Sequence, residues 1–258
     1  MQNMRLFDAN ACLGRPPVRQ PSAFTDAAGL AAAMSASGVS AALVYSPAAI
    51  NADLVAANQR LLAETDVERG IHPAWVLLPP GTGEMDSPVT LVNEMMQRGV
   101  RAARLMPRAH GYAVRVRTLG PLLERLAEHR IPVLLDFGLS AWGDRTHIDW
   151  DGVHEICTAF PVLPVALIRL GLMVDRELYP MLAHHENLYV ETSYYFGHRG
   201  LQALVARFGA RRLIFGTGMP VYAPGPPIAT LNYSGLSAIE QQMVASGNLE
   251  RLLQEVRP

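Results

Sequence analysis

The stretch Arg212-Leu-Ile-Phe-Gly-Thr-Gly-Met-Pro220 has the pattern of a buried strand that stops abruptly. Residues 213–216 are apolar or small, as in a parallel strand that is covered on both faces. Gly-Thr-Gly and a proline follow, a composition that ends a strand and opens a loop. Functional groups of α/β proteins gather at the carboxyl ends of strands, so we expect Thr217 to lie near a functional site.

Similar strand segments precede this one, and a helical pattern follows each of them. The expected strands are 5–8, 40–45, 71–78, 102–106, 132–137, 164–168, 188–191 and 212–216. The expected helices are 25–38, 51–65, 89–98, 119–129, 150–160, 176–185, 201–208 and 236–256. Eight strand-then-helix units predict a closed (β/α)8 TIM barrel that occupies residues 1–258 as a single domain. No Gly-x-Gly-x-x-Gly follows a strand, which argues against a dinucleotide-binding fold.

Composition restricts the possible partners. Half of the 258 residues are apolar, 17% are charged and the formal charge is -1, without a basic stripe for nucleic acid or an anionic membrane. No apolar run approaches a membrane span and no signal peptide begins the chain, so we expect a cytoplasmic protein that acts on small molecules. The two cysteines, Cys12 and Cys157, cannot form a disulfide framework and fit a reducing compartment.

The chain contains no lysine, because all 22 basic residues are arginine. Chemistry that needs a lysine amine is therefore excluded. This removes Schiff-base aldolases, pyridoxal phosphate enzymes, P-loop nucleotidases and bimetallic sites bridged by a carbamylated lysine.

Short motifs at the strand ends occur in an order and spacing that resemble the amidohydrolase superfamily. The likeness is closest to its amidohydrolase-related (amidohydrolase 2) branch, which includes small decarboxylases and lactonases. The stretches that carry it are Leu6-Phe-Asp8 with Gly14, Trp75-Val-Leu-Leu-Pro-Pro80, Gly99-Val-Arg-Ala-Ala-Arg-Leu-Met-Pro107, Ile131-Pro-Val-Leu-Leu-Asp-Phe-Gly138, Leu188-Tyr-Val-Glu-Thr-Ser193, Phe215-Gly-Thr-Gly-Met-Pro220 and Gly247-Asn-Leu-Glu-Arg-Leu-Leu253.

The resemblance also implies a degenerate metal site. Metal-binding members of the family have a His-x-His pair on the first strand, histidines that end the fifth and sixth strands, and an aspartate after the eighth. The corresponding positions here are Asn10, Cys12, Asp136, Arg169 and Gly218. Amide and guanidinium groups are poor replacements for imidazole, and Gly218 lacks the carboxylate that would activate a metal-bound water. We therefore expect no catalytic metal and no cofactor; a metal held by Cys12, Asp136 and a loop histidine is the alternative.

Residues at the strand ends supply the candidate site. Asp136 is the expected acid/base, Cys12 a candidate nucleophile, and loop histidines candidate bases. The catalytic candidates are Asp136, Cys12, His110, His147 and His198; the substrate-binding candidates are Asn10, Trp75, Arg104, Arg169, Glu191, Tyr194 and Thr217. The histidines on predicted helices, 129, 154, 184 and 185, are expected to be solvated or partly packed.

Two functions follow from this reading. The first is metal-independent hydrolysis of a lactone or ester, or a lyase step, on a small carboxylated compound bound by Arg104 and Arg169. The second is a catalytically inactive barrel that binds a ligand or a partner, with a salt bridge between Arg169 and Asp136 in place of the metal. An open cavity lined by these side chains favours the first, and a mutually paired cluster favours the second. Members of this branch are frequently dimers, so the resemblance allows a homodimer.

Overall fold

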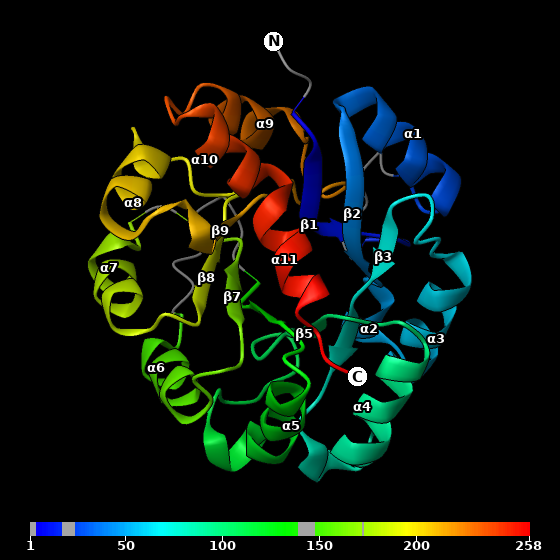
Figure 1. Cartoon of the computed structure of the whole chain (residues 1–258). Coiled ribbons are helices and arrows are strands. Elements are labelled where there is room, and N and C mark those ends of the chain that lie inside the picture. The colour runs from blue at the N-terminus through cyan, green and yellow to red at the C-terminus, as the bar shows by residue number, and fades with distance from the viewer. Residues whose placement is uncertain (1–3, 17–23, 139–147, 172) are drawn as a thin grey trace.

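The computed structural model describes residues 4–16, 24–138, 148–171 and 173–258. Short parallel strands surround a central axis, and helices form an outer ring around them (Figure 1). The strands are β1 (Leu6–Cys12), β2 (Val39–Tyr45), β3 (Ile71–Pro73), β4 (Trp75–Leu77), β5 (Ala103–Leu105), β6 (Val133–Asp136), β7 (Val165–Ile168), β8 (Leu188–Glu191) and β9 (Leu213–Ile214). The predicted (β/α)8 barrel is confirmed.

Backbone pairing divides the barrel wall into two sheets that meet at both edges. The orders are β1-β2-β3 and β4-β5-β6-β7-β8-β9, and every pair is parallel. The predicted strand 71–78 is interrupted at Ala74, whose amide still donates to the carbonyl of Val44 at 2.7 Å. Its two halves, β3 and β4, therefore serve as one barrel strand. The other edge closes through Ala9 N to Phe215 O and Gly218 N to Asn10 O, each 2.9 Å.

The helices differ from the prediction mainly at their ends. Asp26 caps the first helix, which begins at Ala27 rather than residue 25, because its carboxylate accepts from the amide of Gly29. The predicted helix 51–65 begins at Leu54 instead, because the Asp53 carboxylate caps it there, and a separate short helix, Ala48–Asn51, precedes it. The α-helices of the described residues are α1 (Ala27–Ser37), α2 (Ala48–Asn51), α3 (Leu54–Glu64), α4 (Pro88–Gln97), α5 (Val116–Glu128), α6 (Trp150–Ala159), α7 (Asp175–His184), α8 (Gly200–Phe208), α9 (Gly225–Asn232), α10 (Ala238–Gln242) and α11 (Asn248–Gln254). Helix α9 lies in a segment for which only a loop was expected.

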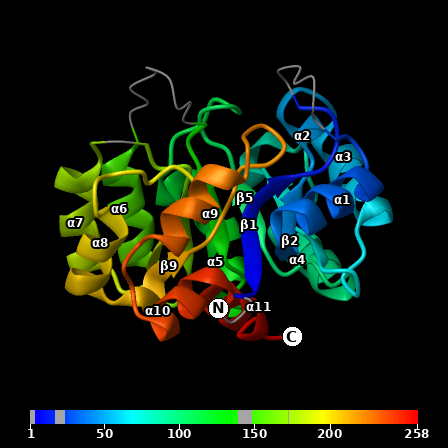
Figure 2. The ribbon, with the colours of Figure 1, turned by 90° about the horizontal axis from the view of Figure 1, so that it is seen from above.

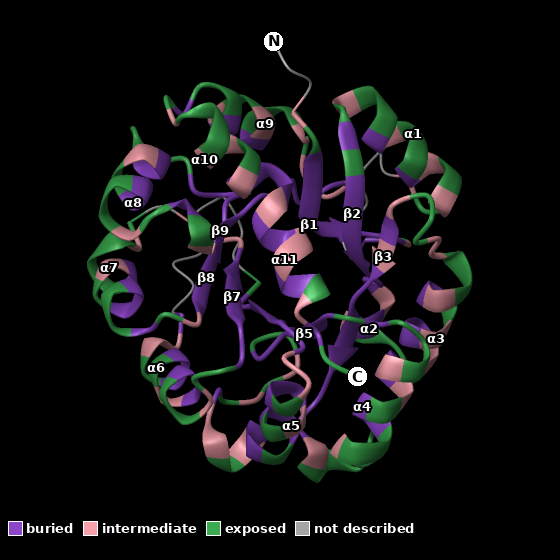
Figure 3. Ribbon diagram, viewed as in Figure 1, coloured by how far each residue is buried: buried purple, intermediate pink, exposed green. Residues whose placement is uncertain are grey.

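Side chains alternate along each strand between the barrel interior and the helix layer. Ala102, Leu134, Ala166 and Ile214 belong to an interior cluster, whereas the intervening residues pack under the helices. Apart from Ser40 and His72 near the starts of β2 and β3, the strands are accordingly buried, while the helices expose their outer faces (Figure 3).

Helix α11 closes one end of the barrel. Leu249, Leu252 and Leu253 join the interior cluster beside Phe7. Asn248 fixes the start of the helix by donating to the carbonyls of Ala210 and Leu213, both at 2.7 Å, and Figure 1 shows α11 lying across the barrel centre. In the turned view, the loops that follow the strands lie at the end opposite to α11 (Figure 2). A functional site must therefore open at the carboxyl ends of the strands.

Within the described ranges, no helix combines the length and apolar character needed to cross a membrane.

Candidate functional site

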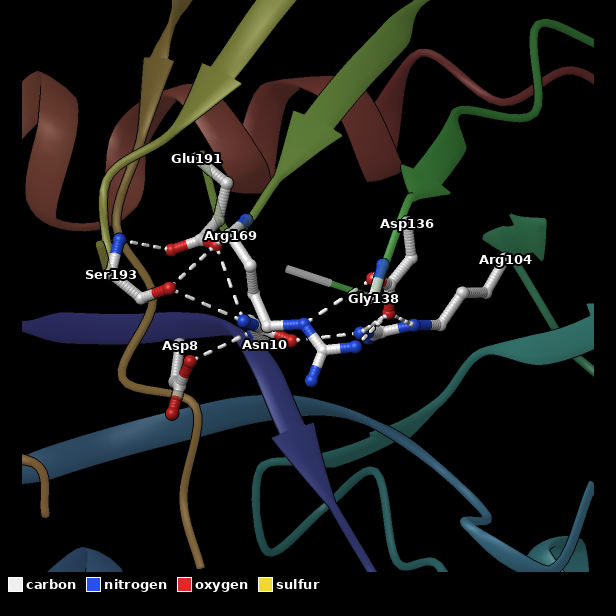
Figure 4. Close-up of polar contacts among 8 residues, drawn as sticks. All are labelled: Asp8, Asn10, Arg104, Asp136, Gly138, Arg169, Glu191 and Ser193. Atoms are coloured by element: carbon white, nitrogen blue, oxygen red, sulfur yellow. Dashed lines mark hydrogen bonds and ion pairs between the residues drawn. The ribbon is translucent and has the colours of Figure 1, made fainter. Parts of the chain in front are cut away.

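Strand alternation directs a group of polar side chains into the open end of the barrel. Arg104 on β5 follows interior Ala102, and Asp136 on β6 follows interior Leu134. Asn10 on β1, Arg169 after β7 and Glu191 on β8 complete the group (Figure 4). These five residues were predicted from the sequence, and the structure brings them into direct contact.

Asp136 lies between two guanidinium groups. Its Oδ2 atom accepts from Arg104 Nη2 and Arg169 Nη2, each at 2.5 Å, and Oδ1 accepts from Arg169 Nε at 3.3 Å and from Gly138 N at 2.8 Å. Burial alone would raise the pKa of Asp136, but the charges of Arg169 and Arg104 outweigh it and hold that pKa well below its usual range. The salt bridge expected between Arg169 and Asp136 is thus confirmed. The expected acid/base role of Asp136 is not supported, because a carboxylate paired in this way remains ionised.

Arg104 is as buried as a core residue. Its guanidinium carbon lies 3.7 Å from the centroid of the Tyr45 ring, and Nη2 also donates to Asn10 Oδ1 at 3.0 Å. Only 1% of the Arg104 side chain is exposed. This burial argues against the prediction that Arg104 binds substrate; its contacts instead hold Asp136 and Asn10 in place.

Arg169 is the more accessible of the two arginines. Its side chain is 13% exposed, and Nη1 forms no hydrogen bond with any residue of the described ranges. The backbone at Arg169 adopts a left-handed conformation with φ 56°, which is strained for a residue with a side chain. Glu191 supports this conformation, since its Oε2 accepts from the amide of Arg169 at 3.0 Å.

Glu191 is fully buried and surrounded by donors. Its Oε2 also accepts from Ser193 Oγ at 2.8 Å and from Asn10 Nδ2 at 3.2 Å, and Oε1 accepts from the amide of Ser193. Burial raises the pKa of Glu191 to about 7, despite these hydrogen bonds. A glycine at 216 is required beside it, because a Cβ there would lie 2.2 Å from Glu191 Oε1.

Asp8 and Thr217 fasten the first strand to the loop after β9. Asp8 Oδ1 accepts from the amides of Asn10 at 2.8 Å and Thr217 at 2.9 Å, and the Thr217 hydroxyl donates to Asp8 Oδ2. Burial raises the pKa of Asp8. Thr217 was expected to bind substrate, but its hydroxyl is engaged within this turn, where it also accepts from Met219 N at 3.1 Å.

Gly218 is crowded by two aromatic rings. A Cβ at this position would lie 3.0 Å from the Tyr222 ring and 3.6 Å from the Tyr194 ring, and φ is 78°. The two rings meet edge to face with centroids 4.5 Å apart. The predicted binding residue Tyr194 therefore does lie next to the strand ends, in space that the side chain of an aspartate at 218 would need.

The other catalytic candidates are placed less favourably. Cys12 is buried next to Tyr45, and this burial raises the pKa of its thiol to about 11, which disfavours the thiolate that a nucleophile needs. His110 Nε2 lies 3.0 Å from the carbonyl of Ala49, and its ring lines a separate cavity of about 510 Å³ between α2, α3 and the neighbouring loops. His198 is exposed, and His147 lies outside the described residues.

The prediction that Trp75 lines the site is wrong. Trp75 is the first residue of β4, and it packs in the core cluster between the strands and the helices. Ala74 and Val76 occupy the opposite strand face, so alternation turns the indole away from the barrel interior. Tyr45, Ser193 and Tyr222 also belong to the site and were not predicted from the sequence. Tyr45 could have been predicted, because it ends a predicted strand, as the other site residues do.

The site does not suit the metal ion of metal-binding amidohydrolases. Its nearest oxygen donors, Asn10 Oδ1 and Asp136 Oδ2, both accept from Arg104, and Arg169 adds a second fixed positive charge. A divalent cation would have to displace these guanidinium groups and would meet their charge. Among the described residues, no three His, Cys, Asp or Glu side chains converge here as metal ligands would.

The fold and this site define a (β/α)8 barrel with a polar cluster at the carboxyl ends of its strands. The sequence model of the family described as amidohydrolase matches residues 15–254, so the chain belongs to the amidohydrolase family, a family of enzymes. No curated protein shows significant similarity to the chain.

Solved structures share the fold over almost the whole chain. A TIM-barrel protein of unassigned function from Bordetella bronchiseptica is 18% identical, with a TM-score of 0.72 over 98% of this chain and 99% of that one. A 2,6-dihydroxybenzoate decarboxylase from Rhizobium is 14% identical, with a TM-score of 0.74 over 98% and 99%. A protein from Pseudomonas putida, proposed to be a 2-pyrone-4,6-dicarboxylic acid hydrolase, is 18% identical, with a TM-score of 0.69 over 98% of both chains.

Proposed function

We propose that the protein is an enzyme that acts on a small carboxylated compound, by hydrolysis of a lactone or ester or by a lyase step, without a metal at the barrel mouth. The observation that carries this proposal is the charge at the strand ends. Arg104 and Arg169 contribute two positive charges and Asp136 one negative charge, which leaves one positive charge. The raised pKa values of Asp8 and Glu191 disfavour their charged forms, so they neutralise this charge only partly.

Arg169 is the proposed anion-binding residue. Its Nη1 group is available to a substrate carboxylate, while Nε and Nη2 remain on Asp136. Asp136 and Glu191 then act as positioning residues, because they fix the guanidinium and the backbone of Arg169. A rigid arginine is well suited to hold a carboxylate, since little side-chain entropy is lost on binding.

Glu191 is the proposed proton carrier, in place of Asp136; because it is fully buried, it exchanges its proton through the Ser193 hydroxyl rather than by direct contact with the substrate. Its pKa of about 7 suits a group that both accepts and returns a proton near neutral pH, and the hydroxyl of Ser193 offers a route for that proton. In lactone hydrolysis, water oxygen bonds to the acyl carbon, the acyl carbon–oxygen bond breaks, and Glu191 passes the proton taken from water to the departing oxygen. In a lyase step, the bond to the carboxyl carbon breaks, carbon dioxide leaves, and a proton from Glu191 replaces it.

The neighbouring structures are consistent with this substrate class. The decarboxylase from Rhizobium and the protein from Pseudomonas putida carry names of carboxylated aromatic or pyrone compounds. The absence of lysine from the sequence, and the lack of suitable metal ligands at the mouth among the described residues, favour a route that uses proton transfer and an arginine. We also propose a cytoplasmic location, because Cys12 and Cys157 are buried free thiols.

A second candidate function is ligand binding without catalysis. It is favoured by the mutual pairing of Arg104, Asp136 and Arg169, and by Gly218, which supplies no carboxylate near the mouth. In that case Arg169 would still bind a carboxylate, but no turnover would follow.

A substrate screen with matched variants separates these functions. Lactones, esters and carboxylic acids are incubated with the protein, and both product formation and ligand binding are measured. We expect turnover that Arg169→Ala reduces at least about a hundredfold, as for the loss of a positioning charge, with Arg98→Ala unchanged as a surface control. Binding without turnover would establish the second function, and turnover that is indifferent to Arg169→Ala would contradict the proposed anion site.

A further inference from the structure

Three histidines meet on the outer wall of the barrel, away from the strand ends. His154 lies on α6, His184 is the last residue of α7, and His185 follows it; Figure 1 shows the two helices side by side. One ring nitrogen of each histidine can be chosen so that all lie within 4.8 Å of one another. Among the described residues, no other group of His, Cys, Asp and Glu side chains brings three potential metal ligands together so closely.

The rings are already near the separation that a shared metal ion requires. His154 Nδ1 lies 2.9 Å from His185 Nε2, and the three ring centroids are 4.8–5.3 Å apart. Zinc–nitrogen bonds of about 2.0–2.1 Å place two ligand nitrogens of a tetrahedral site about 3.3–3.4 Å apart. Small ring rotations would therefore exchange the hydrogen bond between His154 and His185 for two bonds to one ion.

Polar contacts to the backbone hold this group in place. Arg212 Nη1 donates to the carbonyls of Leu182 at 2.7 Å and His185 at 2.8 Å, which fixes the end of α7. Asn187 Nδ2 donates to the carbonyls of Cys157, Phe160 and Leu163, which joins the segment after α7 to the end of α6. The scaffold is thus ordered before any ion binds, and less entropy is lost on binding.

The surroundings also suit a cation. His184 and His185 lie at the C-terminal end of α7, where the helix dipole favours positive charge. His185 is only 4% exposed, whereas His154 and His184 are exposed and leave a path for an ion and its water ligands.

We propose that His154, His184 and His185 form a binding site for a divalent transition-metal ion of the zinc class, with water in the remaining coordination position. Three neutral imidazoles match the ligand preference of Zn²⁺, Ni²⁺ and Cu²⁺, and exclude the oxygen-seeking Mg²⁺ and Ca²⁺. The ion would join α6 to α7 from outside the barrel. This site is independent of the proposed reaction at the mouth.

The test is zinc titration of the full-length protein, prepared without a histidine tag and freed of metal. We expect one Zn²⁺ per chain by calorimetry and a rise in Tm with zinc concentration, because an ion that binds only the folded state stabilises it. His154→Gln should weaken binding about tenfold or more, and His198→Gln, which changes an exposed histidine elsewhere, should leave it unchanged.

A spectroscopic measurement on the same variant tests which atoms bind the ion. His185 is buried and its variant could unfold, so the exposed His154 carries the decisive substitution. Cu²⁺ bound in place of Zn²⁺ should show nitrogen hyperfine coupling in its paramagnetic resonance spectrum, and His154→Gln should reduce it. No stoichiometric Zn²⁺ binding, or binding that His154→Gln leaves unchanged, would overturn the proposal.

Discussion

Arg169 Nη2 lies 2.5 Å from Asp136 Oδ2, and the two residues pair directly at the ends of neighbouring barrel strands. The second guanidinium, of Arg104, contacts the same oxygen at the same distance. Asp136 is therefore the anion around which two permanent cations are packed. The positive charges of these two guanidinium groups are the basis of the proposed binding of carboxylated compounds.

Removing the charge of Asp136 should unfold the protein at a markedly lower denaturant concentration. Asp136→Asn would leave the buried guanidinium of Arg104 without its counter-ion, and the loss of one partner from a buried pair costs about 3–5 kcal/mol. Urea unfolding followed by circular dichroism measures the change. Glu128→Gln, which breaks an exposed pair with Arg125, should cost less than about 1 kcal/mol. Equal effects of the two substitutions would contradict the structural role of Asp136.

The aromatic ring of Tyr45 should stabilise the folded protein, because the guanidinium group of Arg104 packs on the face of this ring. Tyr45→Leu removes the aromatic surface that lies 3.7 Å from the guanidinium carbon of Arg104, whereas Tyr45→Phe retains it. We expect Tyr45→Leu to be less stable than Tyr45→Phe by about 1–3 kcal/mol, from the lost cation–π contact and packing. Chemical denaturation of the two variants under one buffer condition decides the matter, and equal stability would refute the contact.

The raised pKa of Glu191 predicts the sign of a pH effect on stability. Between pH 4.5 and about 7, the folded protein holds a proton on Glu191 that the unfolded chain has released. The contribution of Glu191 to the free energy of unfolding therefore falls as pH rises through this window, with a slope of up to about 1.4 kcal/mol per pH unit. Asp136 contributes in the opposite direction, and only at lower pH, because its folded pKa is depressed.

Denaturation of the wild-type protein and of Glu191→Gln across pH 4.5–7 isolates this contribution. The difference in the free energy of unfolding between the two proteins should change with pH in the direction stated. A difference that is flat across the window would show that Glu191 has an ordinary pKa. Glu191 would then lose its proposed role as proton carrier.

Gly216 should tolerate no side chain. Gly216→Ala places a methyl group 2.2 Å from Glu191 Oε1, so the carboxylate and its hydrogen bond to the amide of Arg169 must shift. We expect a loss of stability of about 1–3 kcal/mol, as for other overpacked sites, together with weaker carboxylate binding. Gly81→Ala is the matched control, since no atom lies within 4 Å of its Cβ position. An unchanged Gly216→Ala protein would contradict the packing described at this position.

Much of the fold could be predicted from the sequence because barrel strands and helices have strong local patterns. Apolar runs that end in Gly or Pro, such as the one that ends at Gly216, indicated where the strands lie. The number of these runs predicted a (β/α)8 barrel. The break at Ala74 and the cap at Asp53 were missed, because each depends on a single hydrogen bond rather than on a pattern. The face of Trp75 could not be predicted, because Trp75-Val-Leu is apolar throughout and buried on both sides, so its pattern does not distinguish the barrel interior from the helix layer.

The sequence predicted which residues form the site, but not which of its carboxyl groups carry a proton. Strand ends identified Arg104, Asp136, Arg169 and Glu191, because all barrel strands end at one face. Which carboxylate is ionised depends on ångström-scale distances that no spacing reveals: Asp136 contacts two guanidinium groups, and Glu191 contacts none. The contact between His154 and His185 was also missed, since it depends on how α6 packs beside α7 rather than on either helix alone.

The most direct test of the central claim is the effect of a chelator on turnover of a carboxylated lactone or acid identified in the screen. The measurement is made on His154→Gln, so that an ion on the outer wall does not influence the result. We predict the same turnover rate with and without EDTA, and loss of turnover when Arg169→Ala is added. Turnover that EDTA abolishes and added zinc restores would contradict the claim that Arg169, rather than a metal ion, provides the positive charge at the barrel mouth.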